Sequence, residues 1–199
     1  MAIKYQFNKT SLQLLEKQLK VRERALPTIK NKESALRIEV KKAKVEVQRL
    51  DELLEEKIVH YDKMIALWSE FNSALVSVDD VSLSVKKIAG VKIPVLNKID
   101  FSIAPYSLFN TPHWFPEGIE LVKSLAQIGI ERELVDQKLN LLEHARKKTT
   151  QKVNLFEKVQ IPGYQDAILK IKRFMEDEEN LSKSAQKIVK TRQEEEVEP

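Results

Sequence analysis

The sequence predicts a mostly α-helical protein, in which two long helices form an antiparallel coiled coil with a small head, containing a β-hairpin, at the turn between them. Three observations predict this fold. Apolar residues recur in a 3-4 rhythm near both ends of the chain. Four of the seven prolines and two of the four glycines fall within residues 80–120. Inside that middle region, apolar and polar residues alternate as they do in a β-strand.

The first apolar stripe follows Thr10 and Ser11, which we expect to cap a helix. In the 3-4 series up to Trp68, fourteen of seventeen positions are apolar, although only 42% of the whole chain is hydrophobic. The rhythm then continues to Val78. We therefore expect one helix over residues 11–77, about 100 Å long.

The middle segment, residues 79–117, has the pattern of a compact head. Val81, Leu83 and Val85 alternate with serines, and the alternation resumes after Gly90. This pattern predicts a β-hairpin near residues 81–96. Pro94 cannot donate a hydrogen bond to a neighbouring strand, so we expect it to face outward on an edge. Residues 97–116 are expected to be irregular, with at most one helical turn.

The second apolar stripe predicts a helix over residues 118–190. Eight of eleven positions in the 3-4 series from Leu121 to Phe156 are apolar, and the stripe resumes from Tyr164. Residues 191–199 carry no apolar face and are expected to fray. The predicted organisation is thus one elongated domain divided into four segments: 1–78, 79–117, 118–190 and 191–199.

Pro27 and Pro162 lie inside the two predicted helices, where each removes a backbone hydrogen bond. If Ser77 lies level with Pro116, then Pro27 lies opposite residue 166 and Pro162 lies opposite residue 31. We therefore expect one bend shared by both helices, without a break in either. Two unrelated local kinks are the alternative.

Positive charge is concentrated in two stretches that the antiparallel arrangement brings together. Residues 17–50 hold eleven basic and four acidic residues, and residues 143–173 hold eight basic and three. The antiparallel arrangement would gather these residues into a basic belt on the coiled coil. The charges alone favour a solvated surface with ion pairs inside each helix, and a belt that contacts partners is the alternative. The belt lysines that we select as candidate partner contacts are Lys41, Lys42, Lys44, Lys147 and Lys148.

The residues needed for several kinds of chemistry are missing. The chain has no Cys, and its four glycines are too scattered for a phosphate-binding loop. Glu56 and His60 lie one helical turn apart but lack a third metal ligand. We therefore predict a protein that is not an enzyme and has no catalytic residues, cofactor or metal. No apolar run is long enough to span a membrane, and no signal-peptide core is found near the amino terminus, so an intracellular protein is expected.

Three stretches together resemble the D subunit of V/A-type rotary ATPases, the central rotor axle. The most specific is SVKKIAGVKIPVL at residues 84–96, which is similar to the family's hairpin with its AGV-x-[IV]-P core. The first helix is similar to the family's Leu…Lys-x-Lys-x-x-x-Leu helix in Leu19, Lys30, Lys32 and Leu36, preceded by Thr10 and Leu14-Leu15. The third stretch, residues 147–179, resembles the family's T-x-x-[RK]-V-N-x-[LF]-E in Thr150, Lys152, Val153, Asn154, Phe156 and Glu157, followed by Ile161-Pro162.

The chain also departs from the family pattern. Pro27 falls where the family usually continues a plain helix, and Gly163 stands where a larger residue is common. Lys and Glu dilute the Arg-rich character of the first helix. These departures indicate a divergent bacterial branch.

The resemblance implies a non-catalytic rotor axle inside a ring of three catalytic (A) and three non-catalytic (B) nucleotide-binding subunits. Its rotation would couple ATP hydrolysis or synthesis in the ring to proton or sodium transport through a membrane rotor. Further implied partners are the small F subunit of the stalk and the socket of the membrane rotor, which the C (d) subunit forms. The implied location is cytoplasmic and peripheral to the inner membrane. The hairpin head is implied to project near the lower end, which adds Val91, Ile93 and Pro94 to the candidate partner contacts.

Two other functions fit parts of the pattern. A coiled-coil adaptor or tether would share the two helices, but it would not need AGVKIP between them. A nucleic-acid-binding coiled coil would use the basic belt, but it needs basic residues clustered with exposed aromatics. Here the aromatic residues fall on the apolar stripe or in the head, so we predict neither a nucleic-acid partner nor a membrane span.

Overall fold

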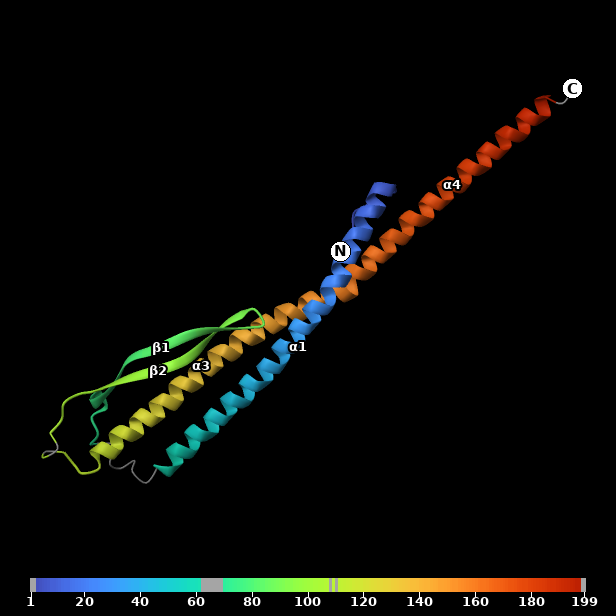
Figure 1. Cartoon of the computed structure of the whole chain (residues 1–199). Helices are drawn as coiled ribbons and strands as arrows, with labels where there is room; N and C mark the ends of the chain where they lie inside the picture. Colours follow the sequence, from blue (N-terminus) through green and yellow to red (C-terminus); the bar gives the residue numbers. More distant parts are fainter. Residues whose placement is uncertain (1–2, 62–69, 108, 110, 198–199) are drawn as a thin grey trace. The chain divides into compact units, whose positions relative to one another are not determined.

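The computed structural model describes residues 3–61, 70–107, 109 and 111–197, and it is mostly helical (Figure 1). The elements in chain order are α1 (Lys9–His60), a short 3-10 turn η2 (Ser73–Leu75), β1 (Val76–Ile88), β2 (Val91–Ile103), α3 (Phe115–Asn154), the π-helical segment η3 (Leu155–Gln160) and α4 (Ile161–Val197). This order of long helix, antiparallel hairpin and long helix confirms the predicted fold class.

The chain forms two compact units, which we describe separately. The terminal unit contains Met1–Asn31 and Thr149–Pro199, so it holds the start of α1 and all of α4. The hairpin unit contains Lys32–Lys148, with the rest of α1, the hairpin and most of α3.

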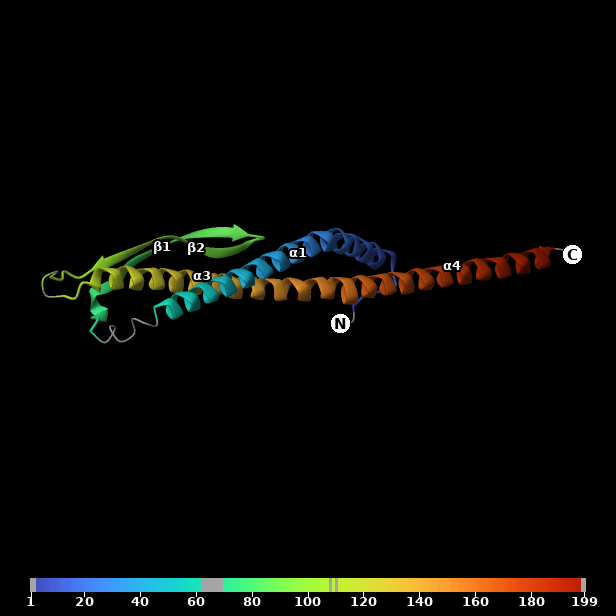
Figure 2. The ribbon, with the colours of Figure 1, turned by 90° about the horizontal axis from the view of Figure 1, so that it is seen from below.

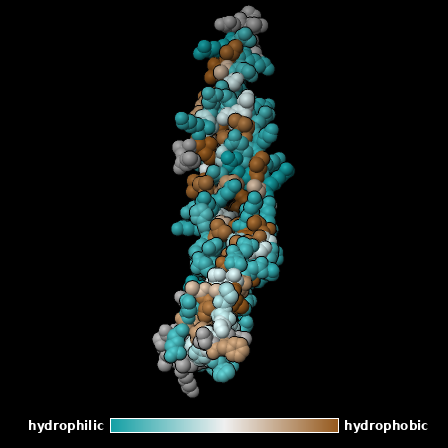
Figure 3. Space-filling model, turned by 90° about the vertical axis from the view of Figure 1, so that its left-hand side faces the viewer, coloured by the Kyte–Doolittle hydropathy of each residue, from teal (hydrophilic) through white to brown (hydrophobic). Residues whose placement is uncertain are grey.

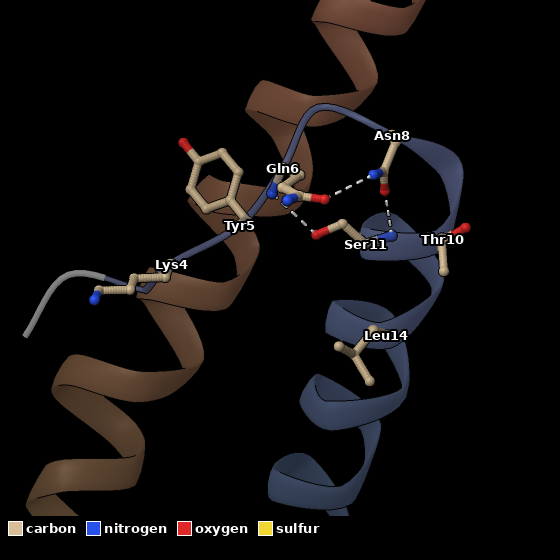
Figure 4. Close-up of a pocket in the computed structure, with 7 residues that line it drawn as sticks. All are labelled: Lys4, Tyr5, Gln6, Asn8, Thr10, Ser11 and Leu14. Carbon is tan, nitrogen blue, oxygen red and sulfur yellow. Dashed lines mark hydrogen bonds between the residues drawn. The ribbon is translucent and has the colours of Figure 1, made fainter.

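In the terminal unit, α1 begins at a side-chain cap. The Ser11 N–H donates to Oδ1 of Asn8 at 2.7 Å, the contact that an N-cap asparagine makes with the third helical residue. The Gln6 N–H in turn donates to the Ser11 hydroxyl oxygen at 3.3 Å (Figure 4). Our expectation that Thr10 and Ser11 cap the helix was therefore wrong, because both lie within its first turn.

The core of the terminal unit holds two antiparallel helical stretches together. Its buried residues are Leu15, Tyr164, Ala167, Ile168 and Ile171, and the extended segment before α1 packs against them through Ile3 and Tyr5. A Cβ atom at Gly163 would lie 3.2 Å from Cδ1 of Ile3. Gly163 stands where the related family usually has a larger residue, and its lack of a side chain leaves room for the amino-terminal segment.

Neither proline breaks a helix. α1 continues through Pro27, and Pro162 is the second residue of α4. Immediately before it, the Ile161 N–H donates to the Phe156 carbonyl, a π-type bond. The wider π turn accommodates a proline that cannot donate and would crowd the carbonyl four residues earlier.

The register assumed from the sequence was wrong. Arg22 Nε donates to Oε1 of Gln160 at 2.8 Å, and Lys30 Nζ contacts Oε1 of Glu157 at 2.6 Å. Pro27 is therefore level with the π-helical segment η3 and not with residue 166. Pro27 in α1 and the π-helical segment η3 therefore do lie at the same level along the pair of helices. The bend that we predicted there stays a prediction.

In the hairpin unit, α1 ends earlier than we predicted. The helix stops at His60, and residues 76–78 belong to β1, where Val76 pairs with Ile103 and Val78 with Phe101. The 3-4 rhythm and the two-residue alternation coincide over this stretch, so the apolar positions alone did not separate helix from strand. Met64 and Trp68, which we placed on the helical stripe, lie outside the described residues.

The hairpin lies along the helices of its own unit and does not project from them (Figures 1 and 2). Ile93 is 1% exposed and packs in one core with Leu36, Val40, Ala43 and Leu142. Ala89 and Gly90 have φ angles of 48° and 84°, which the turn requires. A Cβ atom at Gly90 would lie 3.3 Å from Nζ of Lys32, so the turn reaches the start of the unit's α1 stretch.

The hairpin is longer than the predicted 81–96 because bulges interrupt its alternation. The register shifts between Val78 and Asp80 and again between Ser82 and Leu83. Each shift moves the following side chains to the other face, which hides the strand from a search for strict alternation. Pro94, expected to face outward, is half-buried in a groove with Leu134 and Val135 of α3.

The last part of α4 is helical through Val197, although we expected residues 191–199 to fray. Glutamate, lysine, glutamine and arginine, which fill this stretch, are good helix formers. Residues 176–193 are all exposed. The helix therefore continues beyond the core of the terminal unit.

Candidate functional site

The five candidate lysines all lie in the hairpin unit and are all exposed. Lys41, Lys42 and Lys44 are on α1, and Lys147 and Lys148 are on α3. The two sets occupy facing stretches of the two helices, because Lys44 reaches Glu143, one turn before Lys147. The lysines that the sequence singled out are thus brought together.

Nearby acidic side chains reduce the net positive charge around these lysines. Lys44 Nζ lies 2.7 Å from Oε1 of Glu143, and Lys42 Nζ lies 2.9 Å from Oε1 of Glu39. The hydrogen bond from Lys44 lowers the pKa of Glu143 below its usual value, although partial burial opposes the shift. Two of the five lysines thus make ion pairs, one within α1 and one between α1 and α3, and contact of these lysines with a partner stays a prediction. Each such exposed pair contributes little stability.

The three hairpin candidates occupy different environments. Ile93 is in the core, so its contacts are within the chain and it anchors the hairpin. Val91 packs at the edge of the same core, and Pro94 lies in the groove beside α3. The candidate partner contacts that remain are therefore the five lysines and the partly exposed Val91 and Pro94.

Polar contacts between the helices are a feature that our sequence reasoning missed. Arg22 lies 4.4 Å above the Tyr164 ring and donates to Gln160, while the Tyr164 hydroxyl donates to Oε1 of Gln18 at 2.7 Å. In the hairpin unit, Arg132 Nε donates to Oδ1 of Asp51 at 2.9 Å, which raises the pKa of the arginine. Both arginines interrupt the apolar stripe in the sequence, and that interruption could have identified them.

One pocket of the described chain lies beside the cap of α1. A pocket of about 400 Å³ lies beside the start of α1, lined by residues such as Lys4, Tyr5 and Leu14 (Figure 4). The side chains of Gln6, Asn8 and Ser11 in it bond to one another or to nearby backbone and form the helix cap. In the part of the chain that the structure describes, no cluster of three or more His, Asp or Glu could hold a metal ion.

The surface is mixed. On the face drawn in Figure 3, hydrophilic and hydrophobic residues are interspersed. The described end of α4 exposes large apolar side chains, with Leu181 71%, Ile188 56% and Val189 54% exposed. None of the described helices has the length and apolarity needed to cross a membrane.

These features together define a class of protein. Two antiparallel helical stretches with buried cores, polar contacts between the helices and exposed charged and apolar surface are typical of a structural component of a larger assembly.

Comparison with known proteins identifies the family. The profile that describes the D subunit of ATP synthase matches residues 11–191. The D subunit of the V-type ATP synthase of Borreliella burgdorferi is 33% identical over 197 residues, which cover 94% of each chain. The corresponding subunit of Chlamydia trachomatis is 31% identical over 157 residues, covering 76% of this chain and 77% of the relative, and that of Chlamydia pneumoniae is 26% identical over 185 residues, covering 89% and 87%.

The chain belongs to the family of ATP synthase D subunits. Its function is that of a central-stalk subunit in a membrane-associated V-type ATPase complex, and the rotor role follows from the family. Members of this family are accessory stalk subunits. The resemblance suggested by the motifs at 84–96 and 147–179 is thereby confirmed.

Proposed function

We propose that this chain is the non-catalytic axle that turns inside a ring of three A and three B nucleotide-binding subunits. Its rotation couples ATP hydrolysis or synthesis in that ring to proton or sodium transport through the membrane rotor. The F subunit of the stalk and the rotor socket formed by the C (d) subunit bind it, and the complex places it at the cytoplasmic face of the inner membrane. The observation that carries this proposal is the family match over residues 11–191.

The two helical stretches give the axle a physical basis. An axle shifts the conformational equilibria of three equivalent catalytic subunits only if, in each of its orientations, it makes different contacts with each of them. A pair of helices has no threefold symmetry, so it meets this condition. Cross-helix contacts such as Lys30 with Glu157 and Arg132 with Asp51 oppose sliding of one helix past the other within each unit.

The exposed residues provide surfaces for the surrounding subunits. The lysines on α1 and α3 are attracted over a long range to an acidic sleeve, and each ion pair is weak enough to leave the axle free to turn. The apolar residues exposed along α4, Leu181, Ile188 and Val189, suit contact with a ring that surrounds the end of the axle.

The lysine surface is tested by replacing Lys41, Lys42, Lys44, Lys147 and Lys148 together with Gln. We expect weaker assembly with the ring, or ATP hydrolysis with less ion transport per ATP. The matched control replaces the same five lysines with Arg, which keeps the charge and should retain coupling. Unchanged assembly and transport in the Gln variant would contradict a role for this surface.

The axle assignment itself is tested by isolating the tagged chain with its partners and weighing the intact complexes by native mass spectrometry. We expect one copy of the chain with three A and three B subunits. Recovery of another stable partner without any ATPase subunit would instead support the coiled-coil adaptor.

A further inference from the structure

Among the described residues, the outer edge of β1 has no partner strand in the two-stranded sheet. β1 has thirteen residues and no proline, and Leu83 and Val85 on it are 48% and 70% exposed. β2 is the strand that lines the groove beside α3, through Pro94, Val95 and Leu96. Figure 1 accordingly draws β2 between β1 and α3. An exposed strand edge of this length is a template for another strand.

The sequence of this edge is complementary to itself. Residues 79–87 are DDVSLSVKK, which are symmetric in apolar and polar positions around Leu83 and opposite in charge at the two ends. An antiparallel copy centred on Leu83 would place Asp80 opposite Lys86 and Val81 opposite Val85. Leu83 would then face Leu83 of the second copy across a two-fold axis.

The charges of β1 are not neutralised within the hairpin. Asp80 lies opposite Asp100, and Lys87 lies opposite Lys92. Like charges directly opposite one another destabilise a strand pair. The carboxylate of Asp100 is paired with Lys98 on its own strand.

Within the ranges that the structure describes, Asp79, Asp80, Lys86 and Lys87 form no ion pair. Asp79 lies at a register shift, so the pairing between copies would be carried by residues 80–86. A second β1 would bring a lysine to each aspartate and an aspartate to each lysine. It would also cover the exposed Leu83 and Val85, two residues that the hairpin leaves about half or more open to solvent.

We propose that β1 pairs antiparallel with β1 of a second copy of this chain, which joins two hairpins into one four-stranded sheet. The two-fold axis passes beside Leu83. This contact goes beyond the proposed function, in which one copy acts as the axle. It concerns the chain outside the assembled complex, where the edge of β1 is open to another copy.

A single engineered cysteine tests both the contact and its register, because the chain has no native Cys. In the full-length Leu83→Cys variant, the two thiols would face each other with Cα atoms about 4.5–5.5 Å apart, within the range that a disulfide spans. Oxidation should therefore produce a covalent dimer. In Val85→Cys, each thiol would face Val81, and the two thiols would be offset by four residues, about 13 Å. This control should stay uncrosslinked.

Charge reversal tests the pairing without relying on oxidation. Asp80→Lys turns two attractive pairs per dimer into repulsive ones, and so does Lys86→Asp. Each should weaken dimerisation in sedimentation equilibrium about tenfold or more. The double variant restores both pairs with the charges exchanged and should recover dimerisation. Asp80→Lys also removes the repulsion from Asp100 inside the hairpin, so damage to the hairpin does not account for a loss.

The expected result is a concentration-dependent dimer that crosslinks at residue 83, not at residue 85, and is rescued in the double charge variant. A chain that stays monomeric over the measured range would overturn the proposal. So would a dimer that crosslinks equally at residue 85, or one that is unaffected by Asp80→Lys, since either would place the contact in another register or on another surface such as the exposed face of α4.

Discussion

Replacing Ile93 with Ala should release the hairpin from the helices without melting them. In the two strands that the structure describes, Ile93 is the only buried residue, and it is 1% exposed. The substitution deletes three carbon groups at about 0.8 kcal/mol each, or about 2.4 kcal/mol in transfer free energy. The cavity left beside Leu36 and Leu142 adds to this loss, so we expect about 2.5–4 kcal/mol in total.

Amide hydrogen exchange followed by mass spectrometry measures this effect. Because 1.4 kcal/mol corresponds to a tenfold change, exchange in residues 88–93 should become about fiftyfold faster or more. Exchange in the α1 and α3 stretches of the hairpin unit should change much less, since Leu36, Val40 and Leu142 still pack together.

Ile103→Ala is the matched control, because it makes the same change on the same strand at a residue that is 42% exposed. Its loss should be about 1 kcal/mol or less, since little or no cavity forms at the surface. Equal effects of the two substitutions would refute the anchoring role of Ile93. Faster exchange in both helices after Ile93→Ala would show that hairpin and helices unfold as one unit.

Two further predictions concern the ends and the charges of the helices. Asn8→Ala removes the acceptor of the Ser11 N–H and should lower the free energy of unfolding by about 1 kcal/mol in urea titration, whereas Asn8→Asp keeps the cap; equal losses in both would contradict the capping role. The folded-state pKa of Glu143 is lowered by Lys44, so this carboxylate stabilises the fold above its unfolded-state pKa, and the contribution is lost as the pH falls through the folded-state pKa. Glu143→Gln should therefore lose less stability than the unmodified chain as the pH falls from about 5 to 3, and parallel pH curves would contradict the pairing.

The apolar pattern predicted the elements better than it predicted their ends. The long apolar stripes identified both long helical regions of the chain, because a helix that buries one face needs apolar residues at the helical period. The end of α1 and the start of β1 were missed, because Val78 fits both the 3-4 series of the predicted helix and the two-residue alternation of β1. The hairpin was shortened to 81–96 because its bulges interrupt the alternation at Asp79 on β1 and at Asn97 on β2.

Of the candidate site, the sequence predicted only which side chains are exposed to solvent. Charged side chains on a helix are almost always exposed, so the position of the five lysines followed from the sequence. The role of Ile93 did not follow from the sequence. The alternation in a strand shows which residues are apolar, but it does not show which other segment of the chain packs on them. The packing of the hairpin against Leu36 and Leu142 depends on contacts between segments far apart in the chain.

The register of the two helices shows why polar residues carry information that an apolar stripe lacks. Sliding one helix by a heptad leaves apolar layers facing apolar layers, so the stripe alone permits several registers. The register that we assumed differs from the observed one by about one heptad, and it would have placed Arg22 against Ile171, a fully buried core residue. A buried guanidinium without a partner costs several kcal/mol, whereas the observed register gives it Gln160 and the Tyr164 ring. The arginines that weaken the stripe are therefore the residues that select one register among those that the stripe allows.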